Sequence, residues 1–245
     1  MRGNLRIELA EDYADMSKKA ADIFADFMRA NLKGGFGFAT GGTPVGLYEE
    51  LVKKNERGEL DFREITTFNL DEYYPIKNDN PQSYHYFMHE KLFSKVNVDP
   101  EKINIPNGET ENVIEECKEY EARIIACGGI ICQILGIGVN GHIGFNEPSD
   151  SFGADIRRVD LASETIKANV KYFGHPNLMP RQAITMGIRS IMMAKNILLL
   201  ASGASKAGIL WDALMGPITP SVPASVLQLH RSVIVVADKE AGIYL

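Results

Sequence analysis

The segment Thr40-Gly41-Gly42-Thr43-Pro44 places a glycine pair between an apolar run at 35–39 and a stretch that continues to about residue 55. Glycine lets a backbone approach an anion closely, and free N–H groups at a helix start point toward it. Proline suits the first helical turn, because its missing N–H is not needed there. The pattern predicts a strand, a phosphate-binding turn formed by Gly41, Gly42 and Thr43, and a helix. It is not a P-loop, since Val45-Gly46-Leu47 replaces Gly-Lys-Ser/Thr.

Alternating strand and helix patterns continue along the chain. Strands are predicted near 35–39, 62–69, 103–105, 130–136, 155–160, 183–187, 196–201 and 232–237, and helices near 11–31, 44–55, 81–94, 110–127, 204–215 and 239–244. Such alternation indicates an α/β protein with a single open, largely parallel sheet flanked by helices on both faces, in a Rossmann-like arrangement. We expect one domain that spans residues 1–245.

Composition excludes several classes of protein. The net charge of −6 argues against a nucleic-acid partner, and no apolar run is long enough to span a bilayer. No signal-peptide core follows the first residues. Cys117, Cys127 and Cys132 form no C-x-x-C pair and are interpreted as free thiols in a reducing cytoplasm. We therefore expect a cytoplasmic protein without nucleic-acid or membrane partners.

The segment Gly136-Ile137-Gly138-Val139-Asn140-Gly141 matches the dinucleotide fingerprint G-x-G-x-x-G after a predicted strand. The helix that the fingerprint requires is not expected, because glycine, asparagine and proline interrupt residues 142–153. Without a helix start there is no N–H array for a pyrophosphate. The sequence therefore disfavours nicotinamide binding.

Three groups suited to proton transfer follow predicted strands. Asp71 comes after the strand that ends at Asn69, and His142 and Glu147 come after the strand that ends at Gly136. Ligands of open parallel sheets bind at the carboxyl ends of strands, where the phosphate-binding turn also lies. We expect all three groups in one cleft, with a carboxylate fixing the tautomer of the imidazole.

Other basic residues are less informative by themselves. Lys206 stands at another strand-to-helix junction, and Lys171 lies at the start of residues 171–181, which are either a mobile lid or an ordinary connection. His85 and His89 are spaced to share a helix face, but Tyr86 stands where a metalloprotease helix has glutamate. We interpret this pair as part of a helix surface and predict no catalytic metal.

The motifs together resemble the glucosamine-6-phosphate deaminase family. The similar stretches are Ala39 to Pro44, Phe68 to Tyr73, Gly136 to Pro148, Ala183 to Gly187 and Leu227 to His230. They occur in order over nearly the whole chain. The resemblance implies conversion of glucosamine 6-phosphate and water to fructose 6-phosphate and ammonia, in amino-sugar catabolism, with no redox cofactor and no catalytic metal.

The resemblance also implies the roles of individual residues. Asp71 would be the base that moves a proton between C2 and C1, and His142 would assist ring opening with Glu147 as its partner. Asn140 falls at a catalytic position where many members have aspartate. The phosphate would be held by Gly41, Gly42, Thr43, Lys171 and Lys206.

Two further departures from the family pattern carry expectations. Lys171 falls where arginine is usual, and it offers a point charge in place of a bidentate fork, so we expect weaker phosphate binding. Val159 replaces a lysine that binds the effector N-acetylglucosamine 6-phosphate in allosteric members, so activation should be weak or absent. The alternatives are a 6-phosphogluconolactonase-like hydrolase and a non-catalytic sugar-phosphate sensor, and the sequence leaves open whether the chain is a monomer or a homo-oligomer.

Overall fold

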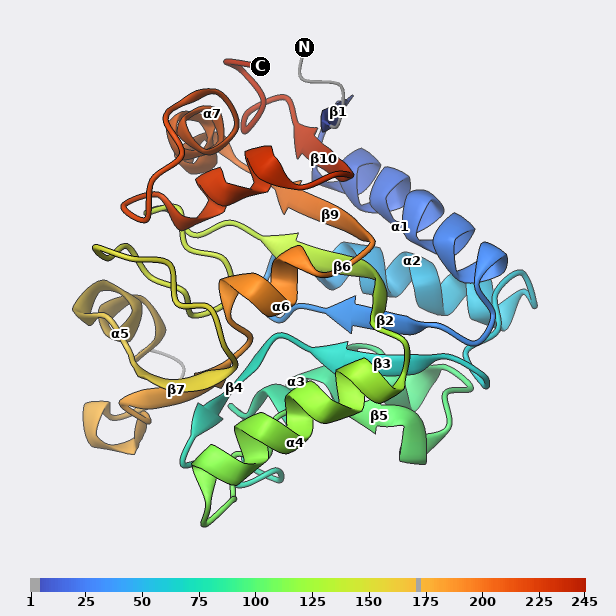
Figure 1. Ribbon diagram of the computed structural model, residues 1–245. Coiled ribbons are helices and arrows are strands. Elements are labelled where there is room, and N and C mark those ends of the chain that lie inside the picture. Colours follow the sequence, from blue (N-terminus) through green and yellow to red (C-terminus); the bar gives the residue numbers. More distant parts are fainter. Residues whose placement is uncertain (1–4, 171–172) are drawn as a thin grey trace.

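The computed structural model describes residues 5–170 and 173–245, and a seven-stranded parallel sheet forms the centre of this part of the chain (Figure 1). The strand order across the sheet is β1-β10-β9-β6-β2-β3-β5. These strands are β1 (Leu5–Ala10), β2 (Gly35–Phe38), β3 (Thr66–Asn69), β5 (Ile103–Asn104), β6 (Ile130–Gly136), β9 (Asn196–Ala201) and β10 (Val233–Asp238). The predicted α/β architecture is confirmed.

Helices and short 3-10 turns connect the strands. The α-helices are α1 (Tyr13–Ala30), α2 (Val45–Glu56), α3 (Tyr84–Lys91), α4 (Val113–Ala126), α5 (Ser163–Asn169), α6 (Ile188–Met192) and α7 (Ala207–Met215). The 3-10 helices are η1 (Phe93–Lys95), η2 (Pro100–Lys102), η4 (Pro176–Leu178), η5 (Ala204–Lys206) and η6 (Pro223–Leu229). None of the helices in the described ranges is both long and apolar enough to cross a membrane.

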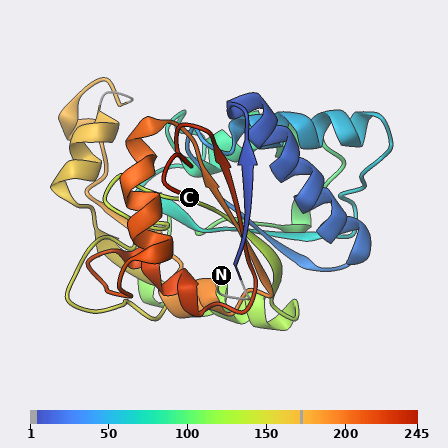
Figure 2. The same cartoon turned by 90° about the horizontal axis from the view of Figure 1, so that it is seen from above.

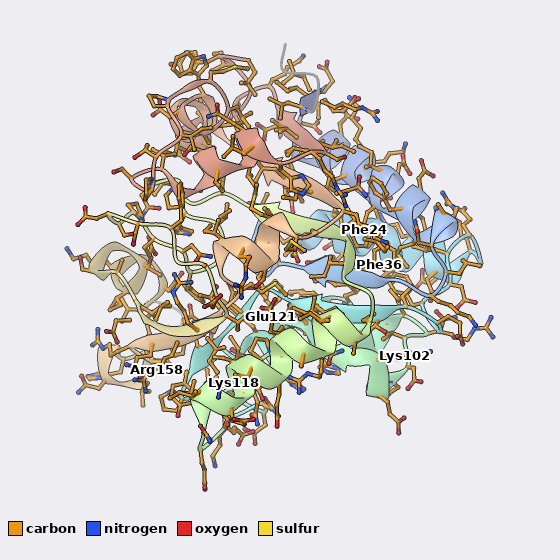
Figure 3. All side chains as sticks on the ribbon, viewed as in Figure 1. Phe24, Phe36, Lys102, Lys118, Glu121 and Arg158 are labelled. Atoms are coloured by element: carbon orange, nitrogen blue, oxygen red, sulfur yellow. The ribbon has the colours of Figure 1, made fainter. Side chains whose placement is uncertain are left out.

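Helices cover both faces of the sheet, with α1 and α2 on one face and α4 on the other (Figure 2). Strand β6 is buried along almost its whole length, which explains its continuous apolar sequence. On the α1 side, Phe24 lies beside Phe36 of β2, and the two ring centroids are 5.5 Å apart in an edge-to-face contact (Figure 3). The apolar stripe of α1 thus faces the central strands.

The strand order reverses between β2 and β6. From β2 the chain proceeds outward through β3 to β5, and from β6 it proceeds in the opposite direction through β9 to β10. At such a switch point the loops after the two strands diverge and leave a crevice at the carboxyl edge. The predicted phosphate-binding turn and the loop after Gly136 flank this crevice.

A second, three-stranded sheet extends the molecule beyond the central one. It has the order β4-β8-β7 and consists of β4 (Asp71–Tyr74), β7 (Arg157–Asp160) and β8 (Gln182–Thr185), all antiparallel. The predicted strands near 155–160 and 183–187 therefore exist, but they pair with each other and with β4 and not within the parallel sheet. Asp71 begins β4, only two residues after β3 ends.

The largest differences from expectation lie near the chain ends. Strand β1 was not predicted, although Leu5, Ile7 and Leu9 alternate with polar residues as an edge strand does. The predicted helix at 239–244 is wrong, because this segment forms turns. Asp238 accepts hydrogen bonds from the N–H groups of Ala241 and Gly242 with its side chain and carbonyl, respectively. The three cysteines are free, as predicted.

Candidate active site

A cavity of about 380 Å³ opens at the carboxyl ends of β2, β3 and β6. It brings together the Gly-rich turn, Asp71 and the loop that carries His142, as the sequence analysis predicted. Lys206 also reaches it. The lining residues are Ala39, Thr40, Gly41, Gly42, Thr43, Pro44, Leu70, Asp71, Tyr84, Gly136, Ile137, Gly138, Val139, Asn140, His142, Gly144, Phe145, Thr165, Asn169 and Lys206.

The Gly-rich turn presents unpaired donors to this cavity. Among the described residues, none accepts a hydrogen bond from the backbone N–H groups of residues 40–43. Gly41 has a φ of 102°, and a Cβ at either Gly41 or Gly42 would meet no atom within 4 Å. The open space and the free N–H groups at the start of α2 form a concave site that favours an anion.

Among the lining residues of the cavity, only Asp71 carries a carboxylate, and 6 % of its surface is exposed. No hydrogen-bond donor from the described residues contacts its side chain. Burial, with the nearby charge of Glu72, raises the pKa of Asp71 to about 8. Gly144 approaches it closely: a Cβ at that residue would lie 3.3 Å from Oδ2, and the φ of Gly144 is 57°. A carboxyl group whose pKa lies near neutral pH can both take up and release a proton in that range.

The neighbouring Glu72 is fully buried and fixes the wall behind Asp71. Its carboxylate accepts hydrogen bonds from the backbone N–H groups of Tyr73, Tyr84 and His85, at 2.8 to 2.9 Å. Burial raises its pKa to about 7, although these donors favour the charged form. Since Tyr84 and His85 begin α3, Glu72 joins β4 to the start of that helix.

The glycines after β6 make room for His142. No helix follows Gly136, as expected, and the loop folds back so that Gly138 N–H donates to the His142 carbonyl at 2.9 Å. A Cβ at Gly138 would lie 2.3 Å from the imidazole ring. Only glycine at 138 therefore leaves room for the side chain of His142.

Glu147 holds His142 within a compact polar network. His142 Nδ1 lies 3.2 Å from Glu147 Oε2, and Asn140 Nδ2 donates to the same oxygen at 2.7 Å. Thr165 donates to the other oxygen, Oε1. Burial raises the pKa of Glu147, but the hydrogen bond and charge of His142, together with the other two donors, outweigh this effect and lower it to about 2. Glu147 is thus ionised at neutral pH.

Asn140 contacts the backbone of His142. Its Oδ1 accepts a hydrogen bond from the His142 N–H at 3.3 Å. Its amide N–H₂ group is directed to Glu147. Asn140 therefore supports the carboxylate of the pair and the backbone of the loop.

Lys206 enters the cavity from the turn after β9. Its Nζ donates to the carbonyl of Ile137 at 2.7 Å, and burial lowers its pKa. Asp238 stabilises this turn, since its carboxylate accepts hydrogen bonds from the Ser202 hydroxyl and the Gly203 N–H. Lys171, the other predicted phosphate ligand, lies outside the described residues.

Sequence reasoning missed three side chains of the cavity wall, Tyr84, Thr165 and Asn169. Tyr84 stacks on Phe145 with parallel rings, and Thr165 and Asn169 belong to α5, which was not predicted. Thr165 and Asn169 are four residues apart, so a predicted helix over this segment would have placed both on one helix face. His85 and His89 share a face of α3 as expected, with ring centroids 4.5 Å apart, but both are half-buried.

Comparison with known sequences extends over almost the whole chain. A family model described as glucosamine-6-phosphate isomerases/6-phosphogluconolactonase matches residues 10–236. A glucosamine-6-phosphate deaminase of Alkaliphilus metalliredigens (strain QYMF) is 51% identical over 238 residues, which cover 97% of this chain and 98% of the relative. A glucosamine-6-phosphate deaminase of Clostridium botulinum (strain Kyoto / Type A2) is 49% identical over 238 residues, which again cover 97% of this chain and 98% of the relative.

Solved structures have the same architecture. A monomeric glucosamine-6-phosphate deaminase superposes with a TM-score of 0.94 at 41% identity and covers 98% of this chain and 100% of its own. A 6-phosphogluconolactonase from Thermotoga maritima has a TM-score of 0.75 at 22% identity, over 96% of this chain and 100% of its own. The second likeness concerns the fold alone.

Proposed function

The chain belongs to the family of glucosamine-6-phosphate isomerases and 6-phosphogluconolactonases, and we propose that it is a glucosamine-6-phosphate deaminase. It converts glucosamine 6-phosphate and water to fructose 6-phosphate and ammonia, an aldose-ketose isomerisation with deamination. The observation that carries this function is the convergence on one cavity of an anion-binding turn, a buried carboxylate of raised pKa and a histidine that is held by Glu147.

The phosphate binds, in this proposal, at the free N–H groups of Gly41, Gly42 and Thr43. A helix start favours an anion through its aligned peptide dipoles as well as its donors. Lys206 adds a positive charge at the same cavity, and we propose Lys171 as a further ligand on the resemblance to the family. Anchoring C6 leaves the sugar ring between the turn and the loop that carries His142.

Asp71 acts as the base that takes the proton from C2 and returns it to C1. Its pKa of about 8 suits this exchange, because a base with a pKa near the working pH both accepts and releases a proton readily. A carboxylate that contacts no donor from the described residues is also a stronger base than one held by hydrogen bonds.

His142 moves protons between oxygens of the sugar during ring opening. Because ionised Glu147 only accepts hydrogen bonds, the proton of the neutral imidazole lies on Nδ1, and Nε2 is left to accept one. Asn140 and Thr165 keep Glu147 in place. Aldose–ketose transfer and ring opening thus use separate groups of one site.

Two further proposals concern the domain organisation and the response to an effector. We propose that residues 1–245 form one domain. We propose weak or absent activation by N-acetylglucosamine 6-phosphate, since valine occupies position 159. Arg157, a cation close to position 159, does not take the place of the lysine in this proposal, because its guanidinium donates to Asn146 Oδ1 at 3.1 Å. Both monomeric and homo-oligomeric states are compatible with the proposed activity.

Ammonia release from glucosamine 6-phosphate by the purified chain tests the proposed function. The expected result is one ammonia for each fructose 6-phosphate formed. Hydrolysis of 6-phosphogluconolactone without ammonia release would replace the proposal by the hydrolase alternative. Binding of glucosamine 6-phosphate without either reaction would instead favour the non-catalytic sensor.

A further inference from the structure

The hydroxyl of Tyr13, the first residue of α1, contacts the anion-binding turn at two points. It donates a hydrogen bond to the carbonyl of Gly42 at 3.1 Å and accepts one from the N–H of Gly46 at 2.8 Å. One side chain from a different helix therefore spans the segment between the glycine pair and the first turn of α2. Tyr13 itself is not among the residues that line the cavity.

Helix α2 lacks a capping side chain of its own. Its N-cap position is Pro44, which makes no side-chain hydrogen bond, although the N–H groups of a first helical turn need an external acceptor. The Tyr13 hydroxyl supplies that acceptor to Gly46. The close approach requires glycine at 46, since a Cβ there would lie 3.1 Å from Tyr13 Cε1 and 2.4 Å from Ser17 Oγ.

The hydrogen bond from Tyr13 to the Gly42 carbonyl sets the direction of the peptide group between Gly42 and Thr43. The peptide between Gly42 and Thr43 is trans, so its carbonyl oxygen and amide hydrogen point in opposite directions. The Gly42 carbonyl accepts hydrogen bonds from the Tyr13 hydroxyl and, at 3.4 Å, from the Val45 N–H. The Thr43 N–H therefore points away from Tyr13, and Thr43 lines the cavity beside residues 40–42, whose N–H groups also meet no acceptor among the described residues.

We propose that Tyr13 is a positioning residue of the phosphate site. Its hydroxyl holds the Gly42–Thr43 peptide in the orientation that presents the Thr43 N–H to the phosphate. This inference rests on the proposed function, which assigns the turn to the substrate's phosphate. It makes α1 part of the binding site, although no side chain of α1 lines the cavity.

Replacement of Tyr13 by phenylalanine keeps the ring and removes only the hydroxyl. Since one backbone hydrogen bond to a neutral group is lost at each of two points, KM for glucosamine 6-phosphate should rise on the order of 3- to 10-fold while kcat changes less than about twofold. The inhibition constant of inorganic phosphate should rise by the same factor. Tyr86→Phe is the matched control, because that tyrosine is 41% exposed on α3.

A purely structural role predicts a different pattern. Tyr13→Phe would then lower the thermal midpoint and leave both KM and phosphate inhibition as in Tyr86→Phe, and this result would overturn the inference. If the wild-type protein releases no ammonia from glucosamine 6-phosphate, the proposed function fails, whatever the Tyr13 variant shows.

Amide hydrogen exchange of the wild-type chain tests the same contacts without a variant. The Gly46 N–H should exchange slowly without ligand, and the Thr43 N–H should become protected only when inorganic phosphate is added. Rapid exchange of the Gly46 N–H, or protection of the Thr43 N–H without phosphate, would contradict the inference. This test depends neither on the activity of the chain nor on the folding of Tyr13→Phe.

Discussion

The imidazole Nδ1 of His142 lies 3.2 Å from Oε2 of Glu147, an oxygen that also accepts a hydrogen bond from Asn140. Since the pKa of Glu147 is lowered to about 2, the carboxylate stays charged over the whole neutral range. It fixes the imidazole tautomer and stabilises the imidazolium when Nε2 takes a proton. The pair is therefore organised before the substrate arrives.

Replacement of Glu147 by glutamine tests this pair. The amide keeps the size of the side chain but removes the charge that stabilises the imidazolium. We expect kcat to fall on the order of 10²- to 10⁴-fold with a small change in KM. Steady-state kinetics measure this change, and Glu90→Gln is the control, because Glu90 is exposed on α3. A kcat within threefold of wild type would remove Glu147 from the proton relay.

The change Asn140→Asp should move the acidic limb of the kcat profile to higher pH. It exchanges a donor to Glu147 for a second carboxylate, and two neighbouring carboxylates raise the pKa of one of them. As the pH falls, the variant should lose activity earlier than wild type. Identical acidic limbs in both proteins would show that Asn140 does not control the ionisation of Glu147.

Thr165→Val should lower kcat, but less than Glu147→Gln does. The valine keeps the shape of the side chain and removes the hydrogen bond from α5 to Glu147 Oε1. We expect kcat to fall on the order of 10-fold, since a hydrogen bond to a charged group is worth roughly 1.5 kcal/mol. Thr165→Ser should restore most of the activity. Equal losses in both variants would mean that packing of α5, and not the hydroxyl, matters.

Lys206→Met should raise KM for glucosamine 6-phosphate at least about tenfold. Methionine retains the apolar stem but loses the charge directed at the phosphate, whose charge-assisted hydrogen bonds are among the stronger ones. The exposed Lys33 provides the control, as Lys33→Met. An unchanged KM in Lys206→Met would exclude that lysine from the phosphate site.

Sequence patterns predicted the site better than they predicted its surroundings. The positions of the turn, Asp71, His142 and Glu147 follow from one rule, that parallel strands end at the same edge of a sheet. The antiparallel sheet of β4, β7 and β8 obeys no such local rule. Strand β4 pairs with β8 through residues 108 to 114 positions apart, and β7 pairs with β8 across the 22 to 28 positions that include α5. Pairing across such distances leaves no mark in the local periodicity.

Contacts made by short helices and by single hydroxyl groups were equally hard to predict. Helix α5 is seven residues long, which is too short for a clear apolar period. The hydrogen bond from Thr165 to Glu147 could therefore not be predicted from the sequence. Tyr13 stands twenty-nine residues before Gly42, and nothing in either segment indicates their hydrogen bond. Asp71, by contrast, was placed correctly at the end of β3, although the strand it begins was missed.

Stability should depend on the ionisation of Asp71. Its pKa is about 8 in the folded chain and near 3.8 when unfolded, so the folded state binds more protons between these values and the free energy of unfolding decreases as pH rises. Asp71→Asn removes this titration. The variant's advantage in stability should grow from pH 5 to pH 9, to about 2 kcal/mol or more. Denaturation curves with a constant difference across this range would contradict the raised pKa.

Exchange of the C2 hydrogen in deuterium oxide tests the central claim most directly. Wild-type protein should transfer the hydrogen between C2 and C1 of glucosamine 6-phosphate and exchange part of it with solvent, as NMR of substrate and product would record. Asp71→Asn should still bind the substrate, with a dissociation constant close to the wild-type one, but should show neither transfer nor exchange. Retained transfer or exchange in Asp71→Asn would contradict the assignment of Asp71 as the base.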